Sequence, residues 1–425
     1  MIRHLLVAGL LVLGQPGMAV AGQQATTTPI EHFVVMMQSN HSFDSYFGTY
    51  PGADGIPADV CMPHSTDNLS PDRCVKPFRL GDQSPSDLDH RPATQRAQYN
   101  GGKMNGFVEA FRKNGRDGTN AMGHYDGADL PYYWNIADRF TLFDRFFSSA
   151  LAGSRLNHFY WVAGVPTPTG GEQVPPGGYG DIPTIFDRLQ ERGVPWKFYV
   201  EHYDPKGAGE ATKVPLLNFK RFTGNPELAS RIVDLGEYYR DLDAGTLPAL
   251  AYVVSSGSSE NPPSRIQAGQ SLVQTMTSEL ARSRYWSNSA FLLTYDGWGG
   301  FYDHVAPPKV DEHGYGFRVP ALLMSAYARR GHVDHTQADY TSVLKFVEDN
   351  WKLAPLGSRD AAAASLSSAF DFAAPPRPPE LVGTTRQADA PTGRVRLVVY
   401  LAYASALLAA AACVVVPIAV RRRKR

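Results

Sequence analysis

The chain has 425 residues, of which 43% are hydrophobic, 19% charged and 11% aromatic, and this composition excludes a disordered or collagen-like protein. Its 41 basic and 41 acidic residues cancel, but eight of the basic ones lie in the terminal segments 1–21 and 394–425, which contain no acidic residue. The remaining 33 basic and 41 acidic residues make the body acidic, so nucleic acid is not expected as a partner.

The first 21 residues have the pattern of a secretory signal peptide. Arg3 precedes an apolar run from Leu5 to Leu13, and Ala19-Val20-Ala21 forms a small-residue cleavage site. An uncleaved anchor is the alternative, but the apolar run is short for a membrane span. We therefore expect residues 1–21 to direct export, with the mature chain starting at residue 22.

Two of the three cysteines are expected to form a disulfide. Cys61 and Cys74 have 12 residues between them, in a segment rich in Pro, Asp and Ser, which is typical of a surface loop. An exported domain folds in an oxidising compartment, where such pairs form disulfides. Three cysteines are too few for a disulfide-rich scaffold or for a four-cysteine zinc site.

The body, residues 22–373, has short apolar runs that predict buried strands. Helical spacing appears between these runs, most clearly over Thr341–Leu353. Strands that alternate with helices predict an α/β domain with a mostly parallel central sheet and helices on both faces. The predicted strands are Phe33–Met37, Trp196–Val200, Leu250–Val254, Ala290–Thr294 and Ala321–Met324.

The C-terminal region predicts a membrane anchor. Residues 374–396 are rich in Pro and are expected to form an extended stalk. Residues 397–420 carry no charge and are long enough to span a bilayer, and the basic tail 421–425 is expected on the cytoplasmic side. A buried core helix is the alternative. The sequence thus predicts one C-terminal transmembrane helix, with the main domain extracytoplasmic and anchored to the cell membrane of a bacterial envelope.

Polar residues follow the predicted strands, where ligands bind in parallel sheets. Ser39-Asn40-His41 follow the first strand, Glu260-Asn261 come after the third, and Asp296-Gly297 follow the fourth. Asp89-His90 and Gly153-Ser154 lie between the first two strands. Amide, carboxylate, imidazole and hydroxyl groups are the chemistry of a hydrolytic site, although the sequence contains no Gly-x-Ser-x-Gly, Walker or His-Glu-x-x-His motif.

Taken in order, these segments resemble the bacterial phosphoesterase family that contains non-specific phospholipases C and an acid phosphatase. That family belongs to the alkaline-phosphatase-like superfamily. The resemblance implies an alkaline-phosphatase-like fold and a Ser or Thr nucleophile that attacks phosphorus with the help of a divalent metal ion of unknown identity. The matching stretches are Ile30–Gln38, Ser42–Gly48, Asp89-His90, Asn100–Phe107, Leu130–Tyr133, Ala137-Asp138, Thr294–Asp296, Gly299–Val305 and Thr341–Phe346.

The resemblance also implies roles for individual residues. Ser154 falls at the position of the nucleophile, with Asn157 in the same catalytic motif. His90 would contact phosphate oxygens or protonate the leaving group. The remaining candidates are Asn40 and Asp296 as metal ligands, and His41, Asn261 and His304 in the phosphate or substrate pocket.

Three site positions depart from the family pattern. Ser39 stands where the family has Glu, Gly297 where it has a second carboxylate, and Asn261 where it has His. Divalent cations favour several anionic oxygens, so we expect metal affinity to fall unless nearby groups substitute. The candidates for such substitution are Glu260, Asp44, Asp303 and His304.

Two hypotheses follow from the sequence. The first is a membrane-anchored extracytoplasmic phosphoesterase, resembling phospholipase C or a phosphatase, whose substrates are phosphate esters and include phospholipids. The second is a catalytically degenerate relative that keeps the fold and acts as a binding or surface protein. The replaced positions, Ser39, Gly297 and Asn261, motivate the second hypothesis.

Overall fold

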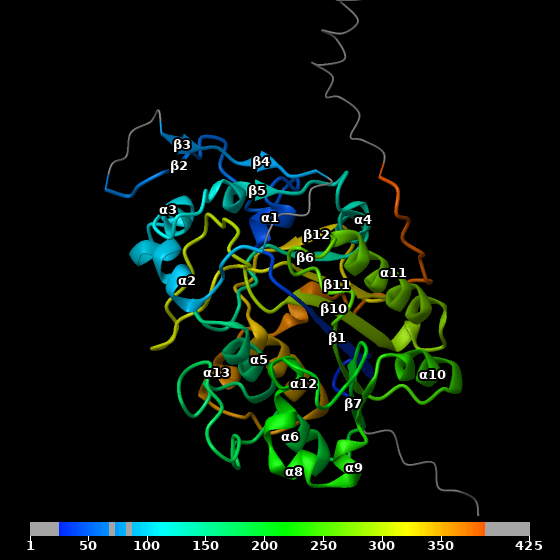
Figure 1. The fold of residues 1–425 in the computed structure, drawn as a ribbon. Coiled ribbons are helices and arrows are strands. Elements are labelled where there is room, and N and C mark those ends of the chain that lie inside the picture. Colours follow the sequence, from blue (N-terminus) through cyan, green and yellow to red (C-terminus); the bar gives the residue numbers. More distant parts are fainter. Residues whose placement is uncertain (1–24, 68–72, 82–86, 387–425) are drawn as a thin grey trace, which may run out of the picture.

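A computed structural model describes residues 25–67, 73–81 and 87–386 of the chain. In this part, helices and strands alternate along the sequence. Eight of the strands form one sheet, and helices cover it (Figure 1). The strands of this sheet are β1 (His32–Gln38), β6 (Thr141–Phe143), β7 (Trp196–Val200), β8 (Ile232–Asp234), β9 (Leu250–Val254), β10 (Ser289–Tyr295), β11 (Ala321–Ser325) and β12 (His332–Asp334).

The strand order is β12-β6-β11-β10-β1-β9-β7-β8. β1 lies inside the sheet and pairs in parallel with β9 and β10, so that Phe33 lies opposite Leu250 and Ala290. β11 runs antiparallel to both of its neighbours, β10 and β6. The α/β class and the predominance of parallel pairing are therefore confirmed, but the sheet is mixed.

The central strands are apolar because both of their faces are covered. Every residue of β1, β9 and β10 is buried, as expected for strands that have helices on both sides. For this reason, each of these strands could be predicted from an uninterrupted apolar run in the sequence. β7 and β9 begin and end at the predicted residues, and β1 and β10 each extend one residue further at both ends.

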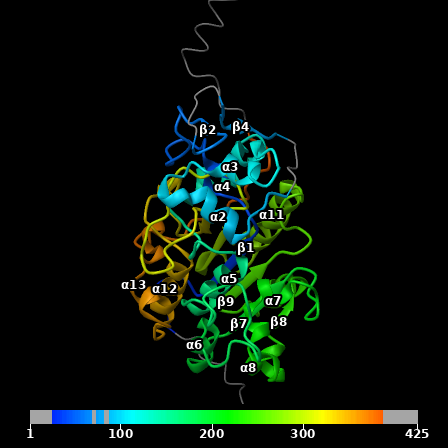
Figure 2. The same cartoon turned by 60° about the vertical axis from the view of Figure 1, so that its left-hand side comes forward.

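Two layers of helices cover the sheet (Figure 2). On one face, Trp161 of α5 stacks on Tyr252 of β9 with ring centroids 4.0 Å apart, and α12 packs beside α5. On the other face, Tyr238 of α10 meets Tyr199 of β7, and α11 packs on α4 and α10. The helices of these layers are α4 (Pro131–Arg139), α5 (Ser154–Ala163), α6 (Ile185–Glu191), α10 (Gly236–Ala244), α11 (Ile266–Arg282), α12 (Tyr340–Trp351) and α13 (Ser358–Ala362).

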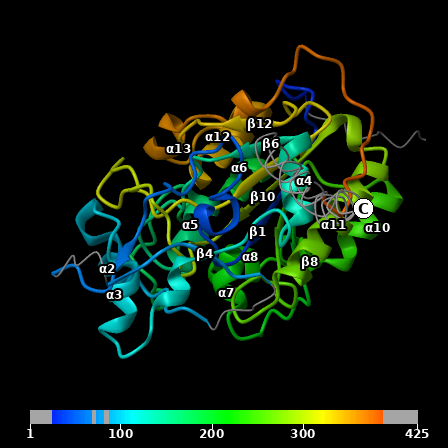
Figure 3. The ribbon, with the colours of Figure 1, turned by 90° about the horizontal axis from the view of Figure 1, so that it is seen from above.

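The short elements between residues 43 and 124 lie over the end of the main sheet at which β1 stops, whereas those between residues 220 and 229 lie at the opposite end (Figures 1 and 3). Cys61 and Cys74 form the predicted disulfide, with Cα atoms 5.4 Å apart, and it joins the two strands of a small hairpin. The short elements are α1 (Phe43–Phe47), β2 (Met62–Pro63), β3 (Cys74–Val75), β4 (Phe78–Arg79), α2 (Pro92–Tyr99), α3 (Phe107–Arg112), β5 (Gly123–His124), α7 (Glu210–Lys213), α8 (Lys220–Thr223) and α9 (Pro226–Ala229).

The predicted membrane anchor is not supported, and this part of the sequence prediction is corrected. Among residues 25–67, 73–81 and 87–386, no helix is both long and apolar enough to cross a bilayer. The longest helix described, α11, has 17 residues and exposes polar side chains along one side, so it is a surface helix of the domain. Single-pass anchoring and a cell-membrane location are therefore unsupported.

Several predicted segments lie outside the described residues. These are the signal peptide 1–21, the span 397–420 and the tail 421–425. The predicted stalk 374–396 is described only as far as residue 386, where it has no regular secondary structure. This part lies against α4, because the Asn135 amide donates hydrogen bonds to the carbonyls of Gly383 (2.8 Å) and Thr385 (3.0 Å).

Candidate functional site

The carboxyl ends of β1, β9 and β10 lie side by side, and the polar residues that follow them meet at this edge of the sheet. The Asn40 backbone N–H donates to Asp296 Oδ1 at 3.0 Å, and the Asn40 side-chain amide donates to Asn261 Oδ1 at 2.7 Å. The Ser154 hydroxyl lies close enough to the Asp296 carboxylate to lower the pKa of that group. The structure thus brings together four residues that the sequence placed in the site.

The backbone of Asn40 has a left-handed conformation, with φ of 66°. Asparagine adopts this conformation more readily than most residues. The following loop closes tightly over it, since a Cβ at Gly299 would lie 2.0 Å from the Asn40 carbonyl oxygen. Gly299 itself has a φ of +65°, so both the space and the backbone require glycine there. This contact fixes the Asp296 loop against the Asn40 loop.

Asp296 is buried, and burial raises the pKa of its carboxyl group. The Ser154 hydroxyl and the hydrogen bond from the Asn40 N–H oppose this rise, as do the nearby His90 and Lys213 side chains. The net pKa is above the usual value for aspartate. A carboxylate in this setting is a better proton acceptor than one on the surface.

Ser154 is the first residue of α5, and Asn157 fixes the turn that precedes it. Asn157 Oδ1 accepts the Ala150 N–H at 2.9 Å. Its amide nitrogen donates to the carbonyls of Ala150, Ala152 and Gly153, each at 3.3 Å. Asn157 therefore holds the turn that places the Ser154 hydroxyl.

Glu172 binds the N-terminus of α5. Its carboxylate accepts the backbone N–H groups of Arg155 at 3.0 Å and Leu156 at 3.3 Å. Helix N-termini attract anions because their first N–H groups have no partner within the helix. Gly153 leaves the space for this carboxylate, since a Cβ there would lie 2.8 Å from the Glu172 carboxyl carbon. An anion is therefore bound directly beside Ser154.

His90 lies close enough to Asp296 for their charges to interact. Its Nδ1 lies 2.8 Å from the Leu88 carbonyl oxygen, which can only accept. Nδ1 therefore carries a proton, and Nε2 is the nitrogen left for proton exchange. The ring meets the edge of Trp298, whose indole N–H is held by Gln98 at 2.7 Å.

His41 is placed away from solvent. It has no exposed surface, and its ring is stacked between Tyr46 and Phe301, with ring centroids 4.2 and 4.9 Å away. Its Nε2 donates to the Glu260 backbone carbonyl at 3.0 Å. Burial lowers the pKa of His41 to about 3, so the ring is neutral near pH 7.

His304 belongs to a separate ion-pair cluster built around Arg318. Its Nδ1 lies 2.8 Å from Asp44 Oδ2, and its Nε2 lies 3.2 Å from Asp54 Oδ1. Burial opposes protonation of His304, but the hydrogen bond and the charge of Asp44 outweigh it and raise the pKa. The fully buried Arg318 guanidinium donates to Asp44 and Asp303, each at 2.9 Å.

Glu260 is buried and faces three tyrosines. The hydroxyls of Tyr46 (2.5 Å), Tyr295 (2.6 Å) and Tyr133 all donate to its carboxylate. Burial raises the pKa of Glu260 to about 7, against the opposing effect of these hydrogen bonds. Both oxygens of its carboxylate accept hydrogen bonds from the tyrosines, so Glu260 does not act as a substitute metal ligand beside Asp296.

Replacing Glu260 by glutamine is expected to change how stability depends on pH. The folded carboxyl keeps its proton up to about pH 7, whereas an unfolded glutamate loses it near pH 4.5. The free energy of unfolding of the parent chain should therefore fall as pH rises from 4.5 to 7, by an amount on the order of 3 kcal/mol. Urea denaturation across this range should show a flatter profile for Glu260→Gln. A profile parallel to that of the parent and of the exposed control Glu191→Gln would contradict this assignment.

The residues that follow β1 and β10 do not make a site for a divalent cation, and the Glu172 carboxylate beside Ser154 is already bound by the N–H groups of Arg155 and Leu156. Asp296 supplies the single carboxylate among the four that meet there, and the Asn40 amide nitrogen is turned toward Asn261. Ser39 and Gly297 add no anionic oxygen. Divalent cations that prefer oxygen ligands take several anionic ones, so the donor set is too weak. Gly297 leaves room for one more group, since a Cβ there would lie 3.6 Å from Asn40 Oδ1.

A second group of ligand-type atoms exists in the described part of the chain. One ligand atom each from Asp44, Asp303 and His304 lies within 4.8 Å of the others. The Arg318 guanidinium already neutralises both carboxylates, so a cation would have to displace a buried arginine. Three of the four residues suggested as substitutes for the missing ligands, Asp44, Asp303 and His304, thus form their own ion-pair cluster. Their side-chain hydrogen bonds are made within this cluster and not to Ser154 or Asp296.

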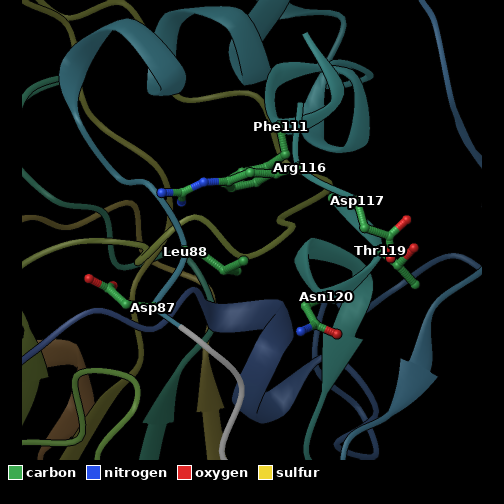
Figure 4. A pocket seen from close by; sticks show the side chains of 8 residues that line it. Asp87, Leu88, Phe111, Arg116, Asp117, Thr119 and Asn120 are labelled. Carbon is green, nitrogen blue, oxygen red and sulfur yellow. The ribbon is translucent and has the colours of Figure 1, made fainter. Parts of the chain in front are cut away.

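A cavity of about 440 Å³ opens beside the segment that carries His90 (Figure 4). In the close-up, Asp87 and the Arg116 guanidinium lie on one side of Leu88, and Asp117, Thr119 and Asn120 lie on the other. Leu88 also touches the loop after β10, because a Cβ at Gly300 would lie 2.7 Å from the Leu88 Cβ. The cavity therefore adjoins the site through Leu88 and offers polar groups of both charges.

Sequence reasoning missed two residues near Ser154. Lys213, at the end of α7, donates from Nζ to the Ser255 carbonyl at 3.2 Å and to the Ser256 hydroxyl at 3.1 Å. Glu172, described above, reaches α5 from the loop that follows it. Neither residue lies in a motif or directly after a strand, so the sequence holds no local signal for them.

The chain is similar in sequence to a known protein family and to several characterised proteins. The model of the Phosphoesterase family matches residues 30–354. Phospholipase C A of Mycobacterium tuberculosis is 28% identical over 413 residues, which cover 82% of this chain and 78% of that protein. Non-hemolytic phospholipase C of Burkholderia pseudomallei is 27% identical over 82% of this chain and 60% of that protein. Non-specific phospholipase C1 of Arabidopsis thaliana is 28% identical over 82% and 72%.

Solved structures align more distantly. The phosphonate monoester hydrolase of Agrobacterium radiobacter is 11% identical, with a TM-score of 0.41 over 80% of this chain and 77% of that chain. A protein in the alkaline phosphatase superfamily from Vibrio parahaemolyticus is 12% identical, with a TM-score of 0.37 over 76% and 68%. These scores are too low to support an argument about the site. The family match, which spans most of the chain, is sufficient: the chain belongs to the Phosphoesterase family.

Proposed function

We propose that the chain hydrolyses phosphate esters, with the Ser154 hydroxyl as the nucleophile. The observation that carries this proposal is that the Ser154 hydroxyl lies beside Asp296, a buried carboxylate at the carboxyl end of β10. A hydroxyl needs an adjacent base to become a competent nucleophile, and Asp296 is in that position. The family match and the phospholipase C relatives support the same class of reaction.

The first step transfers the phosphoryl group to the protein. The Ser154 oxygen bonds to phosphorus while its proton passes to Asp296, and the bond from phosphorus to the leaving ester oxygen breaks. His90, protonated on both nitrogens, gives its Nε2 proton to that oxygen and becomes neutral. The product of this step is an alcohol and a phosphorylated Ser154.

The second step releases phosphate by the reverse proton movements. A water molecule attacks phosphorus and gives its proton to His90, while the bond to the Ser154 oxygen breaks. Asp296 returns its proton to that oxygen, which restores the starting state. Asn157 serves as a positioning residue in both steps, because it fixes the turn before Ser154.

The names of the relatives favour a phospholipid as the substrate of this chain. Three of the compared proteins carry the name phospholipase C, an activity that cleaves the phosphodiester next to the lipid. The cavity bounded by Leu88 adjoins the segment that carries His90. Its mixed polar lining suits a polar or zwitterionic headgroup, which stays on the phosphate when the lipid alcohol leaves, better than an acyl chain.

Replacing Ser154 by alanine is expected to lower kcat for p-nitrophenyl phosphate and p-nitrophenylphosphorylcholine on the order of 10³-fold or more. The substitution removes the attacking oxygen and leaves α5 intact, so the melting temperature should change little. Ser271→Ala, on the exposed side of α11, is the matched control and should keep the parent rate. Equal rates for Ser154→Ala and Ser271→Ala would overturn the assignment of the nucleophile.

A binding protein without turnover is the second candidate. The absence of carboxylates at Ser39 and Gly297 favours it, because it leaves the site with a weak metal donor set. It predicts that both nitrophenyl esters compete with inorganic phosphate for the site but release no nitrophenolate. Detection of turnover that depends on Ser154 would exclude it.

A further inference from the structure

The site beside Ser154 needs a positive charge if it is to hold a phosphate group. Phosphate esters are anions, and the transition state concentrates charge on the equatorial oxygens, which enzymes stabilise with cations or fixed N–H donors. The donor set of Asn40, Asp296, Ser39 and Gly297 does not fit a divalent cation, as shown above. The positive charge must therefore come from the chain itself.

Lys213 is a lysine placed at this edge of the sheet. Its ammonium group is fixed by the Ser255 carbonyl and the Ser256 hydroxyl, the two residues that follow β9. β9 is the neighbour of β1, which carries Asn40, so Lys213 is anchored one strand away from the site. A lysine has three N–H donors, and these two contacts occupy two of them.

Lys213 also lies close enough to the Asp296 carboxylate after β10, and to His158, a buried residue on the first turns of α5, for its charge to lower the pKa of both groups. α7 is held beside α5, because Arg155 donates to the Ala211 carbonyl at 3.4 Å. The ammonium is therefore anchored at the edge of the sheet where Ser154 and Asp296 also lie.

Carboxylates of the chain already lie in this region. The N–H groups at the start of α5 already bind the Glu172 carboxylate, next to Ser154. Glu210, one turn before Lys213, has one carboxylate oxygen 3.5 Å from the Ser256 hydroxyl and a second, buried oxygen with no hydrogen-bond partner. Lys213 thus offsets more than one carboxylate.

We propose that Lys213, rather than a divalent cation, supplies the positive charge that binds the phosphate group beside Ser154. This inference rests on the proposed function for the identity of the site. Lys213 contacts a non-bridging phosphate oxygen with its free N–H, and the ester is cleaved without a metal ion. In this chain, a lysine therefore takes the role of binding the phosphate group that a metal ion would otherwise have.

The test uses the full chain after treatment with a chelating resin and inorganic phosphate as the probe. Isothermal titration calorimetry compares the parent chain, Lys213→Met, Lys213→Arg and the exposed control Lys206→Met from the adjoining loop. We expect phosphate affinity to be the same with and without EDTA, to fall at least tenfold in Lys213→Met, and to be largely retained in Lys213→Arg and Lys206→Met. Melting curves confirm that each variant is folded.

Binding that EDTA abolishes and added Mg²⁺, Ca²⁺ or Zn²⁺ restores would overturn the inference, as would unchanged binding in Lys213→Met. The chelator comparison uses the unmodified chain, so it holds even if a variant does not fold. Hydrolysis of p-nitrophenyl phosphate separates this inference from the proposed function. Turnover that requires a metal supports the function and refutes the lysine, whereas metal-free, Lys213-dependent binding without turnover supports the lysine and refutes the function.

Discussion

The double substitution Ser39→Glu with Gly297→Asp is expected to raise the affinity of the chain for divalent cations by orders of magnitude. It adds two carboxylates beside Asp296, and the space for the second exists, since a Cβ at Gly297 would lie 3.6 Å from Asn40 Oδ1. Gly297 does not have a positive φ, so an aspartate there is not strained. Titration calorimetry with Ca²⁺, Mg²⁺ and Zn²⁺ measures the gain.

A matched control adds the same charge elsewhere. Ser271→Glu with Gly383→Asp places both carboxylates on exposed positions, and nothing lies within 4 Å of a Cβ at Gly383. This variant should bind cations no better than the parent chain. If both double variants gain equally, or if neither gains, then residues 39 and 297 do not face a common site and the alignment of the sequence with its family is wrong at these positions.

Replacing Arg318 by methionine is expected to cost about 3–5 kcal/mol of unfolding free energy. Arg318 is fully buried, pairs with Asp44 and Asp303, and donates to the carbonyls of Asp54 and Asp144, each at 2.8 Å. Methionine keeps much of the volume but leaves two buried carboxylates without their partner. Chemical denaturation with a constant m-value measures this loss.

Arg145→Met is the control for this experiment. Arg145 pairs with Asp54 at 2.6 Å, but its side chain is 43% exposed, and exposed pairs contribute at most about 1 kcal/mol. Adding Asp44→Asn and Asp303→Asn to Arg318→Met should recover part of the loss, because it removes the unpaired charges. A loss below about 1 kcal/mol in Arg318→Met would show that the cluster is hydrated or rearranges, and it would reopen Asp44, Asp303 and His304 as a cation site.

The sequence predicted the sheet where burial leaves a simple signal. β7 and β9 are apolar runs, and their ends follow from the hydrophobicity alone. β6, β8 and β12 have only three residues each, and each of them contains a polar or charged residue. Strands of this length do not form a recognisable pattern, so only the structure reveals them.

The site was predictable where it depends on strand ends. Residues that follow parallel strands meet at one edge, which brought Asn40, Asn261 and Asp296 together as expected. Ser154 comes from a helix start, and its place beside Asp296 followed only from the family resemblance. Such a residue has no signal in composition or spacing, because one serine in a polar loop resembles many others.

The rest depends on tertiary packing. His304 follows the same strand as Asp296, but the loop turns it toward Asp44 and Arg318, a partner 14 residues away in sequence. Lys213 reaches the sheet edge because α7 is held against α5, a contact between segments more than 50 residues apart. Neither placement can be read from local pattern, since both depend on how distant loops fold over the sheet.

The most direct test of the account is to locate the phosphate during turnover. The chain is mixed with p-nitrophenyl phosphate, quenched in acid within one turnover, and digested for peptide mass spectrometry, with Ser154→Ala treated in parallel. The account predicts phosphate on the peptide that contains Ser154, and neither phosphopeptide nor nitrophenolate release in Ser154→Ala. Phosphate on another residue, or release of nitrophenolate from Ser154→Ala at the parent rate, would contradict the account.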